Sequence, residues 1–279
     1  MNRGGGPTRR FERGRARRGA AFTLIELLIV IGIMVVLAVS SVPAIRSLSQ
    51  TNKLAAGSRQ MLDELSYARQ LAVGGRRTVY MLFLPAGTGA HADAVRAHTY
   101  PLRLLQEEDL TLLTNLVTKQ LRGYAIFSWR SAGDQPGRRT PAYLTDWRAL
   151  PDGMLFATNK FVDLSDAAWL QLANTLSPTN RPLPRAWFPF PSANSPPMRL
   201  PYIAFEPTGQ LHYEGGFLPQ RPGESIAIAR GSVFYPQDAQ GRPVLTGAPD
   251  VVETPPGNRQ EILVNWLTGK ARALNPELP

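Results

Sequence analysis

The stretch Ala21-Phe22-Thr23-Leu24-Ile25-Glu26-Leu27-Leu28-Ile29-Val30 opens the longest apolar segment of the chain, and it decides the predicted fold. From Phe22 to Val42 the only charged residue is Glu26. A helix over these residues would rise roughly 31 Å at about 1.5 Å per residue. That is about the length that a helix needs to cross the hydrocarbon core of a membrane. The sequence therefore predicts a membrane-spanning helix over 22–43.

The charge of the chain is concentrated before this segment. Residues 1–21 hold seven arginines and one glutamate, out of 31 basic and 21 acidic residues in the whole chain. Without them 24 basic and 20 acidic residues remain, so the net charge falls from +10 to about +4. Basic residues before an apolar helix hold that end in the cytoplasm. We therefore expect a single pass through the inner membrane, with the N-terminus in the cytoplasm and the remaining chain outside the membrane.

Glu26 is unexpected in an apolar helix. A carboxylate at depth in a membrane costs about 2–3 kcal/mol or more, and a plain membrane anchor has no use for it. If the chain were cut before Phe22, however, the new α-amine would lie four residues from Glu26. In a packed filament, that carboxylate could then pair with the N-terminus of a neighbouring subunit.

The stretch from Ala21 to Val30 resembles the class III signal of type IV pilins and type II secretion pseudopilins. The resemblance implies that a prepilin peptidase cleaves between Ala21 and Phe22 and methylates the new amine. It also implies that Glu26 serves assembly with other pilin or pseudopilin subunits, and that the domain is periplasmic or lies in a filament of the cell envelope. Pro43 stands where this family often has a proline that kinks the helix. Ala21 departs from the family pattern, which usually has glycine before the cut.

Two other interpretations of the N-terminus remain. An ordinary signal peptide has a shorter apolar region, although Ala38-Val39-Ser40 would serve as its cleavage site. A plain signal-anchor helix fits the length of the segment and leaves Glu26 unexplained.

The helix is predicted to continue as an amphipathic segment over 44–75. Apolar residues at spacings near three and four predict a stripe that lies on a globular domain, and Gly74-Gly75 end it. The stripe comprises Ile45, Leu48, Leu54, Met61, Leu62, Leu65, Ala68, Leu71 and Ala72.

A β-rich domain is predicted over 76–279. Strands are expected near 76–85, 97–105, 123–130, 150–157, 201–210, 225–234 and 261–272, and helices over 107–119 and 165–175. Residues 176–201 hold eight prolines and cannot form a central strand. They are either a loop packed on its own domain or an arm that docks a partner.

A second, looser resemblance concerns the two ends of this domain. Phe205-Glu206-Pro207-Thr208-Gly209, Thr268-Gly269-Lys270 and the helix end over 65–72 resemble the GspH/FimT minor pseudopilins. The resemblance implies an α+β fold, in which the long N-terminal helix, membrane-spanning in its first half, packs on a pilin-like, GspH-like β-sandwich.

The sequence offers no catalytic pattern. It has no cysteine, and its three histidines, His91, His98 and His212, lack the spacing of a metal-binding motif. We expect no enzyme activity, no catalytic residues, no metal and no cofactor. Arg138, Arg139, Lys270 and Arg272 could form a basic face for nucleic acid, but the net charge of only about +4 that remains without residues 1–21 argues against such a partner.

Two functions follow from these patterns. The first is a structural subunit that prepilin peptidase processes and that assembles in a type II secretion or type IV pilus-like filament. The second is a membrane-anchored binding module for DNA or another ligand, with the same helix as its anchor.

Overall fold

A computed structural model describes residues 23–88, 107–131, 133–135, 138–216, 218–241, 244, 248–253 and 259–274. Of residues 41–52, 107, 108 and 110 it describes only the backbone. The chain forms two units, Met1–Ser49 and Gln50–Pro279, and each is described by itself.

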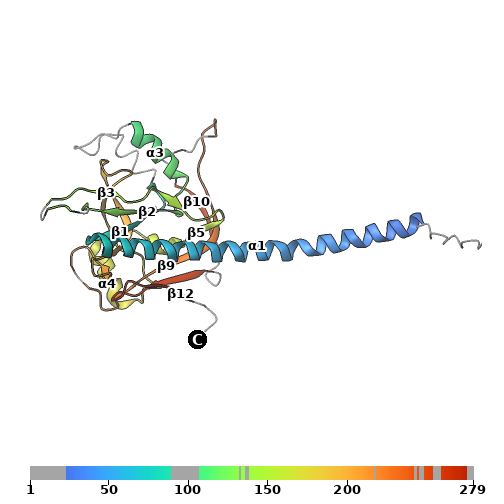
Figure 1. Cartoon of the computed structure of the whole chain (residues 1–279). Coiled ribbons are helices and arrows are strands. Elements are labelled where there is room, and N and C mark those ends of the chain that lie inside the picture. Colours follow the sequence, from blue (N-terminus) through green and yellow to red (C-terminus); the bar gives the residue numbers. More distant parts are fainter. Residues whose placement is uncertain are drawn as a thin grey trace, which may run out of the picture. The chain divides into compact units, whose positions relative to one another are not determined.

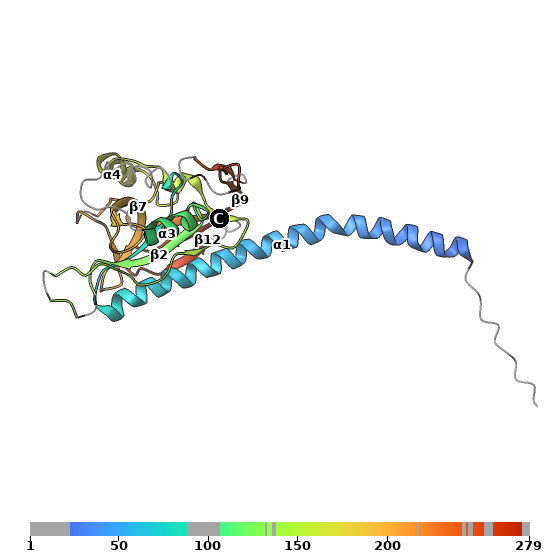
Figure 2. The same ribbon diagram turned by 90° about the horizontal axis from the view of Figure 1, so that it is seen from above.

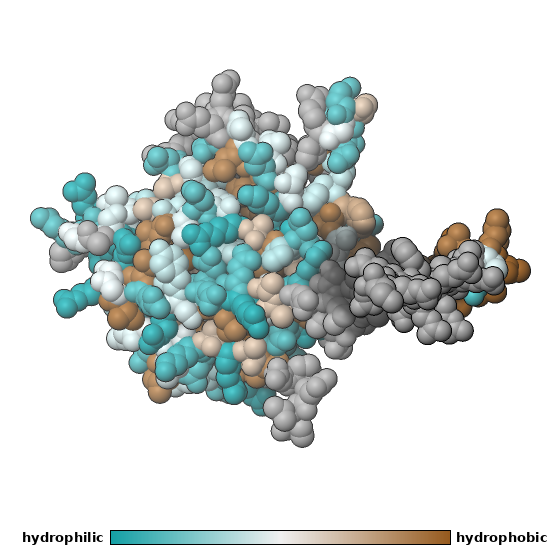
Figure 3. All heavy atoms as spheres, turned by 45° about the vertical axis from the view of Figure 1, so that its right-hand side comes forward, coloured by the Kyte–Doolittle hydropathy of each residue, from teal (hydrophilic) through white to brown (hydrophobic). Residues whose placement is uncertain are grey.

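The first unit contains the beginning of helix α1 (Leu24–Gly75). Large apolar side chains from Leu24 to Val39 are more than two-fifths exposed, and they colour the N-terminal part of α1 brown in Figure 3. Among the described residues, no helix combines the length and the apolar character needed to cross a membrane. The predicted membrane-spanning first half of the helix is therefore wrong.

The second unit is β-rich, with a curled sheet (Figure 1). A seven-stranded antiparallel sheet has the order β3-β2-β1-β7-β6, with β4 on β2 and β8 on β7. Its strands are β1 (Val79–Phe83), β2 (Gly123–Ser128), β3 (Ala142–Tyr143), β4 (Arg148–Ala149), β6 (Arg185–Pro189), β7 (Pro197–Phe205) and β8 (Leu211–His212).

A five-stranded sheet has the order β10-β9-β11-β12, with β5 paired to β9. Its strands are β5 (Met154–Phe156), β9 (Glu224–Phe234), β10 (Asp250–Glu253), β11 (Gln260–Val264) and β12 (Ala271–Leu274). The remaining helices are α3 (Glu107–Val117), the short 3-10 helix η1 (Thr158–Phe161) and α4 (Asp166–Thr175).

The part of α1 in the second unit lies along the strands (Figures 1 and 2) and supplies one wall of the main core. Met61, Leu65, Ala68 and Ala72 are fully buried there. Their spacings of three and four residues place them on one helix face. The predicted apolar stripe is confirmed at these four positions, and Gly75 ends the helix as expected.

Strand β1 separates two cores because its side chains alternate between the faces of the sheet. Val79, Met81 and Phe83 belong to the core that contains α1. Tyr80 and Leu82 belong to a second core, which Leu113 and Leu116 of α3 help to cover.

The proline-rich segment forms part of the seven-stranded sheet, so its prediction as a non-strand excursion is wrong. Residues 197–201 of β7 pair only with β6, and residues 202–205 pair with β1. Pro197 and Pro201 therefore lie where the strand has a single neighbour in the sheet. A proline lacks the N–H that a second neighbour would require.

Several element predictions are confirmed, among them α3, α4, β2, β9 and the β11–β12 hairpin. Ser165 caps α4 as expected, since its hydroxyl accepts a hydrogen bond from the N–H of Ala168. The strand expected over 97–105 lies outside the described residues. The predicted fold, a membrane-spanning helix on a pilin-like β-sandwich, is replaced by a β-rich domain with a curled sheet.

Candidate functional sites: the start of α1 and an arginine-lined cavity

Glu26 closes a reciprocal cap at the start of α1. Its Oε2 accepts hydrogen bonds from the N–H (3.2 Å) and the hydroxyl (3.1 Å) of Thr23. The Thr23 hydroxyl in turn accepts from the N–H of Glu26 at 3.2 Å. This is the capping box of the pattern Thr-x-x-Glu, which satisfies amides that a helix start leaves without partners. Glu26 thus has a role within its own chain, which the sequence analysis missed although the pattern is visible there.

The other predicted processing and assembly residues are less fully described. Ala21 and Phe22 lie outside the described residues. Pro43 lies within the helical span of α1, but its side chain is outside the described part, so the kink stays a prediction.

The three stretches that carry the second resemblance meet at Arg69. The Nε of Arg69 donates to the carbonyl oxygen of Thr268 at 2.7 Å and to that of Gly209 at 3.3 Å. Gly209 and Gly269 have positive φ values of 84° and 61°. A Cβ built at Gly269 would collide with the carbonyl oxygen of Gly209. Both turns therefore need glycine in order to pack on the end of α1.

A cavity of about 690 Å³ opens in the second unit where several strands end. Six arginines line it, together with aromatic side chains, of which Trp187 is 54% exposed. The arginines are Arg76, Arg77, Arg130, Arg139, Arg185 and Arg199. We call this site the arginine cavity.

The carboxylates in the arginine cavity already have partners. Asp166 forms an ion pair with Arg199. Glu214 accepts a hydrogen bond of 2.5 Å from the hydroxyl of Tyr80. Burial, and secondly this hydrogen bond, raises the pKa of Tyr80 far above its usual range, so that the phenol stays a donor.

Several arginines of the cavity lack an acidic partner among the described residues. Arg76, Arg130 and Arg139 form no ion pair there, although the Arg139 guanidinium lies 5.9 Å from the ring centroid of Trp129. The Nε atoms of Arg77 and Arg185 are buried without a hydrogen-bond partner. The cavity thus presents positive charge that the described chain does not neutralise, and this arrangement suits an anion.

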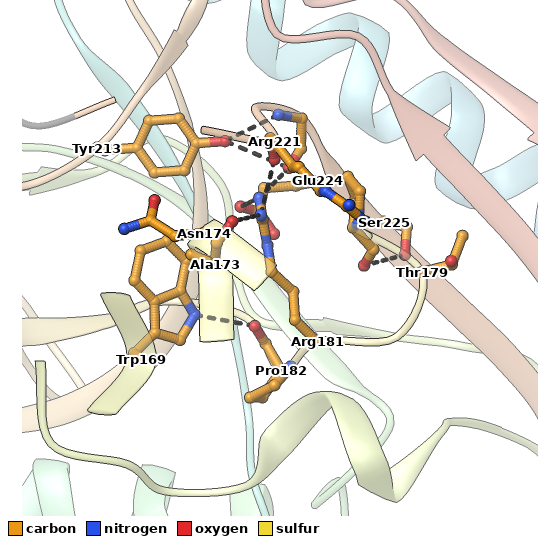
Figure 4. A network of polar contacts seen from close by, with 12 residues as sticks. Trp169, Ala173, Asn174, Thr179, Arg181, Pro182, Tyr213, Arg221, Glu224 and Ser225 are labelled. Atoms are coloured by element: carbon orange, nitrogen blue, oxygen red, sulfur yellow. Dashed lines mark hydrogen bonds and ion pairs between the residues drawn. The ribbon is translucent and has the colours of Figure 1, made fainter. Parts of the chain in front are cut away.

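A network of buried polar contacts around Arg181 joins α4 to residues 177–183 and to the start of β9 (Figure 4). The fully buried side chain of Arg181 pairs with Glu224 at 2.7 Å and donates to the carbonyl oxygens of Ala173 (3.1 Å) and Arg221 (2.7 Å). Its guanidinium carbon lies 5.5 Å from the ring centroid of Trp169, which lines the cavity. Burial raises the pKa of Glu224, while Arg181 opposes that shift.

Lys160 stabilises the same segment, residues 177–183, through hydrogen bonds. Its Nζ donates to the carbonyl oxygens of Pro178 (2.8 Å) and Thr179 (2.7 Å) and to the hydroxyl of Ser225 (2.6 Å). Burial lowers the pKa of Lys160 from 10.5 to about 8. The start of the proline-rich segment is thus held by interior polar contacts.

The histidines do not gather into a site in the described part of the chain. His91 and His98 lie outside it, and His212 contacts Glu206 at 3.2 Å through Nδ1. No group of three or more metal-ligating side chains occurs among the described residues. Of the predicted basic face, only Arg139 lines the cavity, and Arg138, Lys270 and Arg272 do not.

The sequence gives little signal for the arginine cavity, because its arginines come from five separated stretches that only the sheet topology brings together. Comparisons with protein-family models, with curated proteins and with solved structures find no match for this chain.

Proposed function

We propose that this chain is a structural subunit of a pilin-type filament, in a type II secretion or type IV pilus-like machine. A prepilin peptidase cuts it between Ala21 and Phe22, and the mature chain assembles with other pilin or pseudopilin subunits. The observation that carries the proposal is the signal from Phe22 to Glu26 at the start of α1, followed by apolar side chains that stay exposed as far as Val39.

The exposed apolar side chains support assembly. Leu24 is 81% exposed and Ile25 67%, and Val36 and Val39 are 64% and 67% exposed. A helix that is apolar on all sides requires apolar surroundings. In a filament, the same helix of further copies supplies these surroundings.

Glu26 has two roles in this proposal. Within its own chain it closes the capping box with Thr23. In the filament its second oxygen pairs with the cationic N-terminus of a neighbouring subunit. Since only one axial stagger brings the two groups together, this pair fixes the register between subunits. The junction at Arg69, where the stretches that resemble minor pseudopilins meet, adds support that is independent of the N-terminus.

The processing step is tested by mass spectrometry of the mature N-terminus. The proposal requires a chain that begins with N-methylated Phe22. A chain that begins at Ser41 or Ala44 would indicate ordinary signal peptidase, and an intact Met1 would contradict processing altogether.

The assembly step is tested with two variants that separate the roles of Glu26. Glu26→Gln retains the capping box, because glutamine also serves at this position, but it removes the charge. Glu26→Leu removes both. We expect both variants to be missing from sheared or cross-linked filaments, and Glu26→Asp to assemble at an intermediate level. The cellular amount of each variant is the control. If Glu26→Gln assembles as the wild type does, Glu26 only caps the helix and the register argument fails.

A further inference from the structure

Strand β6 is an edge of the seven-stranded sheet, and part of its backbone points away from its neighbour. The N–H of Tyr202 bonds to the carbonyl of Pro184, and the N–H of Phe190 bonds to that of Pro196, each at 3.0 Å. Hydrogen-bonded positions alternate along an antiparallel pair. Positions 186 and 188 therefore also face β7, and the N–H and C=O of Arg185 and Trp187 point outward.

These two outward residues also line the arginine cavity. No described residue occupies their side of β6 in the sheet. Two outward backbone pairs, two residues apart, are the donors and acceptors that an added strand uses. A peptide strand bound to this edge would therefore lie beside the cavity.

The positive charge of the cavity indicates that the bound peptide carries acidic side chains. The side chain of Arg185 is only 9% exposed and forms an ion pair with Asp163 at 3.5 Å, but its Nε lacks a hydrogen-bond partner, as does the buried Nε of Arg77. Arg76, Arg130 and Arg139 form no ion pair among the described residues. Carboxylates match the planar donors of arginine in pairs.

We propose that the edge of β6 and the arginine cavity together bind an extended, acidic peptide segment of another polypeptide, as an added β-strand. The backbone of the peptide pairs with Arg185 and Trp187, its acidic side chains contact the arginines, and an apolar side chain covers Trp187. A nucleic acid or an acidic oligosaccharide would match the arginines but would leave the outward backbone groups unused. This inference does not depend on the filament function, since it concerns the second unit alone.

The binding is tested with the full chain and a fluorescein-labelled heptapeptide of alternating glutamate and valine, by fluorescence anisotropy. We expect saturable binding that weakens as salt is added, since part of the attraction is between charges. Two matched peptides complete the test. One peptide has lysine in place of glutamate. The other keeps glutamate, but its backbone amides are methylated along both edges of the strand. Neither should bind.

Two substitutions of Trp187 separate the contribution of its backbone N–H to peptide binding from that of its side chain. Trp187→Ala removes the indole and keeps the outward N–H. Trp187→Pro removes the N–H as well, without breaking the pairing to β7, because that N–H points away from β7. Pro189 already occupies the equivalent outward position two residues on, so the strand accepts proline there. We expect Trp187→Pro to bind the peptide about tenfold more weakly than Trp187→Ala.

The charge contribution is tested with Arg139→Gln, with Arg138→Gln as the matched control outside the cavity. Only the first should weaken binding, and unchanged thermal unfolding of each variant shows that the fold is kept. Failure of the acidic peptide to bind would overturn the proposal, as would equal binding by the methylated peptide or by Trp187→Pro and Trp187→Ala. Binding of a labelled oligouronate or single-stranded DNA in place of the peptide would overturn it too.

Discussion

Gly269 illustrates how a single residue fixes the junction between α1 and the β11–β12 hairpin. Its φ of 61° lies in the left-handed region, and its missing side chain lets the carbonyl of Gly209 approach. Arg69 then bonds to both turns. The close approach and the hydrogen bonds depend on each other.

We expect Gly269→Ala to lower the free energy of unfolding by about 2–4 kcal/mol, from backbone strain and overpacking together. Gly153→Ala is the matched control, since Gly153 has a φ of 82° but open space around an added Cβ. It should cost only the strain, about 1–2 kcal/mol. Urea unfolding measures both variants, and equal losses would contradict the collision at Gly269.

Lys160 gives the stability a specific dependence on pH. Burial lowers its pKa to about 8, whereas the unfolded chain keeps the ordinary value of 10.5. Between these values the unfolded chain binds more protons, so the free energy of unfolding rises with pH. At lower pH both states are protonated, and the cost of burying the charge is then fully present.

We therefore expect the unfolding free energy of the wild type to rise relative to that of Lys160→Met between pH 7 and pH 10, by up to roughly 3 kcal/mol. Other titrating groups, including the buried tyrosines, cancel in this difference. Urea unfolding at each pH measures it. Lys53→Met, at an exposed position, is the matched control for the loss of a lysine. A difference that falls with pH would mean that Lys160 is held as a cation more strongly than burial opposes it.

At the scale of elements, the C-terminal half of α1 is a structural wall of the domain. Leu65 is fully buried in the main core, whereas Tyr67, two residues further on, is 41% exposed. We expect Leu65→Ala to lower the free energy of unfolding by about 2–5 kcal/mol. Tyr67→Ala should change it by about 0.5 kcal/mol or less. Chemical unfolding followed by circular dichroism checks both, and similar losses would show that the helix does not pack through this stripe.

Most elements of the domain could be predicted from the sequence, because their signals are local. Ser165 caps α4, and the glycines at 74 and 75 end α1. Strand β6 and residues 197–200 of β7 could not be predicted in this way, because prolines argue against a strand until its neighbours are known. The rest of β7 falls within the strand expected over 201–210. Pro197 and Pro201 are tolerated because β1 pairs with a different part of β7, so no neighbouring strand needs their missing N–H groups.

At the scale of the whole molecule, local patterns predict much less. One run of apolar residues predicts a membrane-spanning segment, but no helix among the described residues is both long and apolar enough to cross a membrane. The arginine cavity depends on strand order, since Arg77, Arg130 and Arg185 are neighbours only in the folded sheet. The capping box at Glu26 is the opposite case, as its signal is local and was overlooked.

The proposed processing changes the charge of the molecule by a measurable amount. Removal of residues 1–21 takes away seven arginines and one glutamate, which lowers the net charge from +10 to about +4. We expect isoelectric focusing to show a mature chain with an isoelectric point below the 10.4 of the full sequence. A peptidase-deficient strain provides the control, in which the basic form should accumulate. A single basic form in both strains would contradict cleavage before Phe22.

The bond between Arg69 and Thr268 joins positions 199 residues apart in the chain. A nascent chain in which α1 has already formed still lacks the hairpin that fastens the end of that helix. Contacts of such large sequence separation slow folding, because a long loop must close before they form. The domain therefore completes its core only after synthesis has passed residue 274. Until then the core lacks β11, and any truncation before β11 should leave a product that is readily degraded.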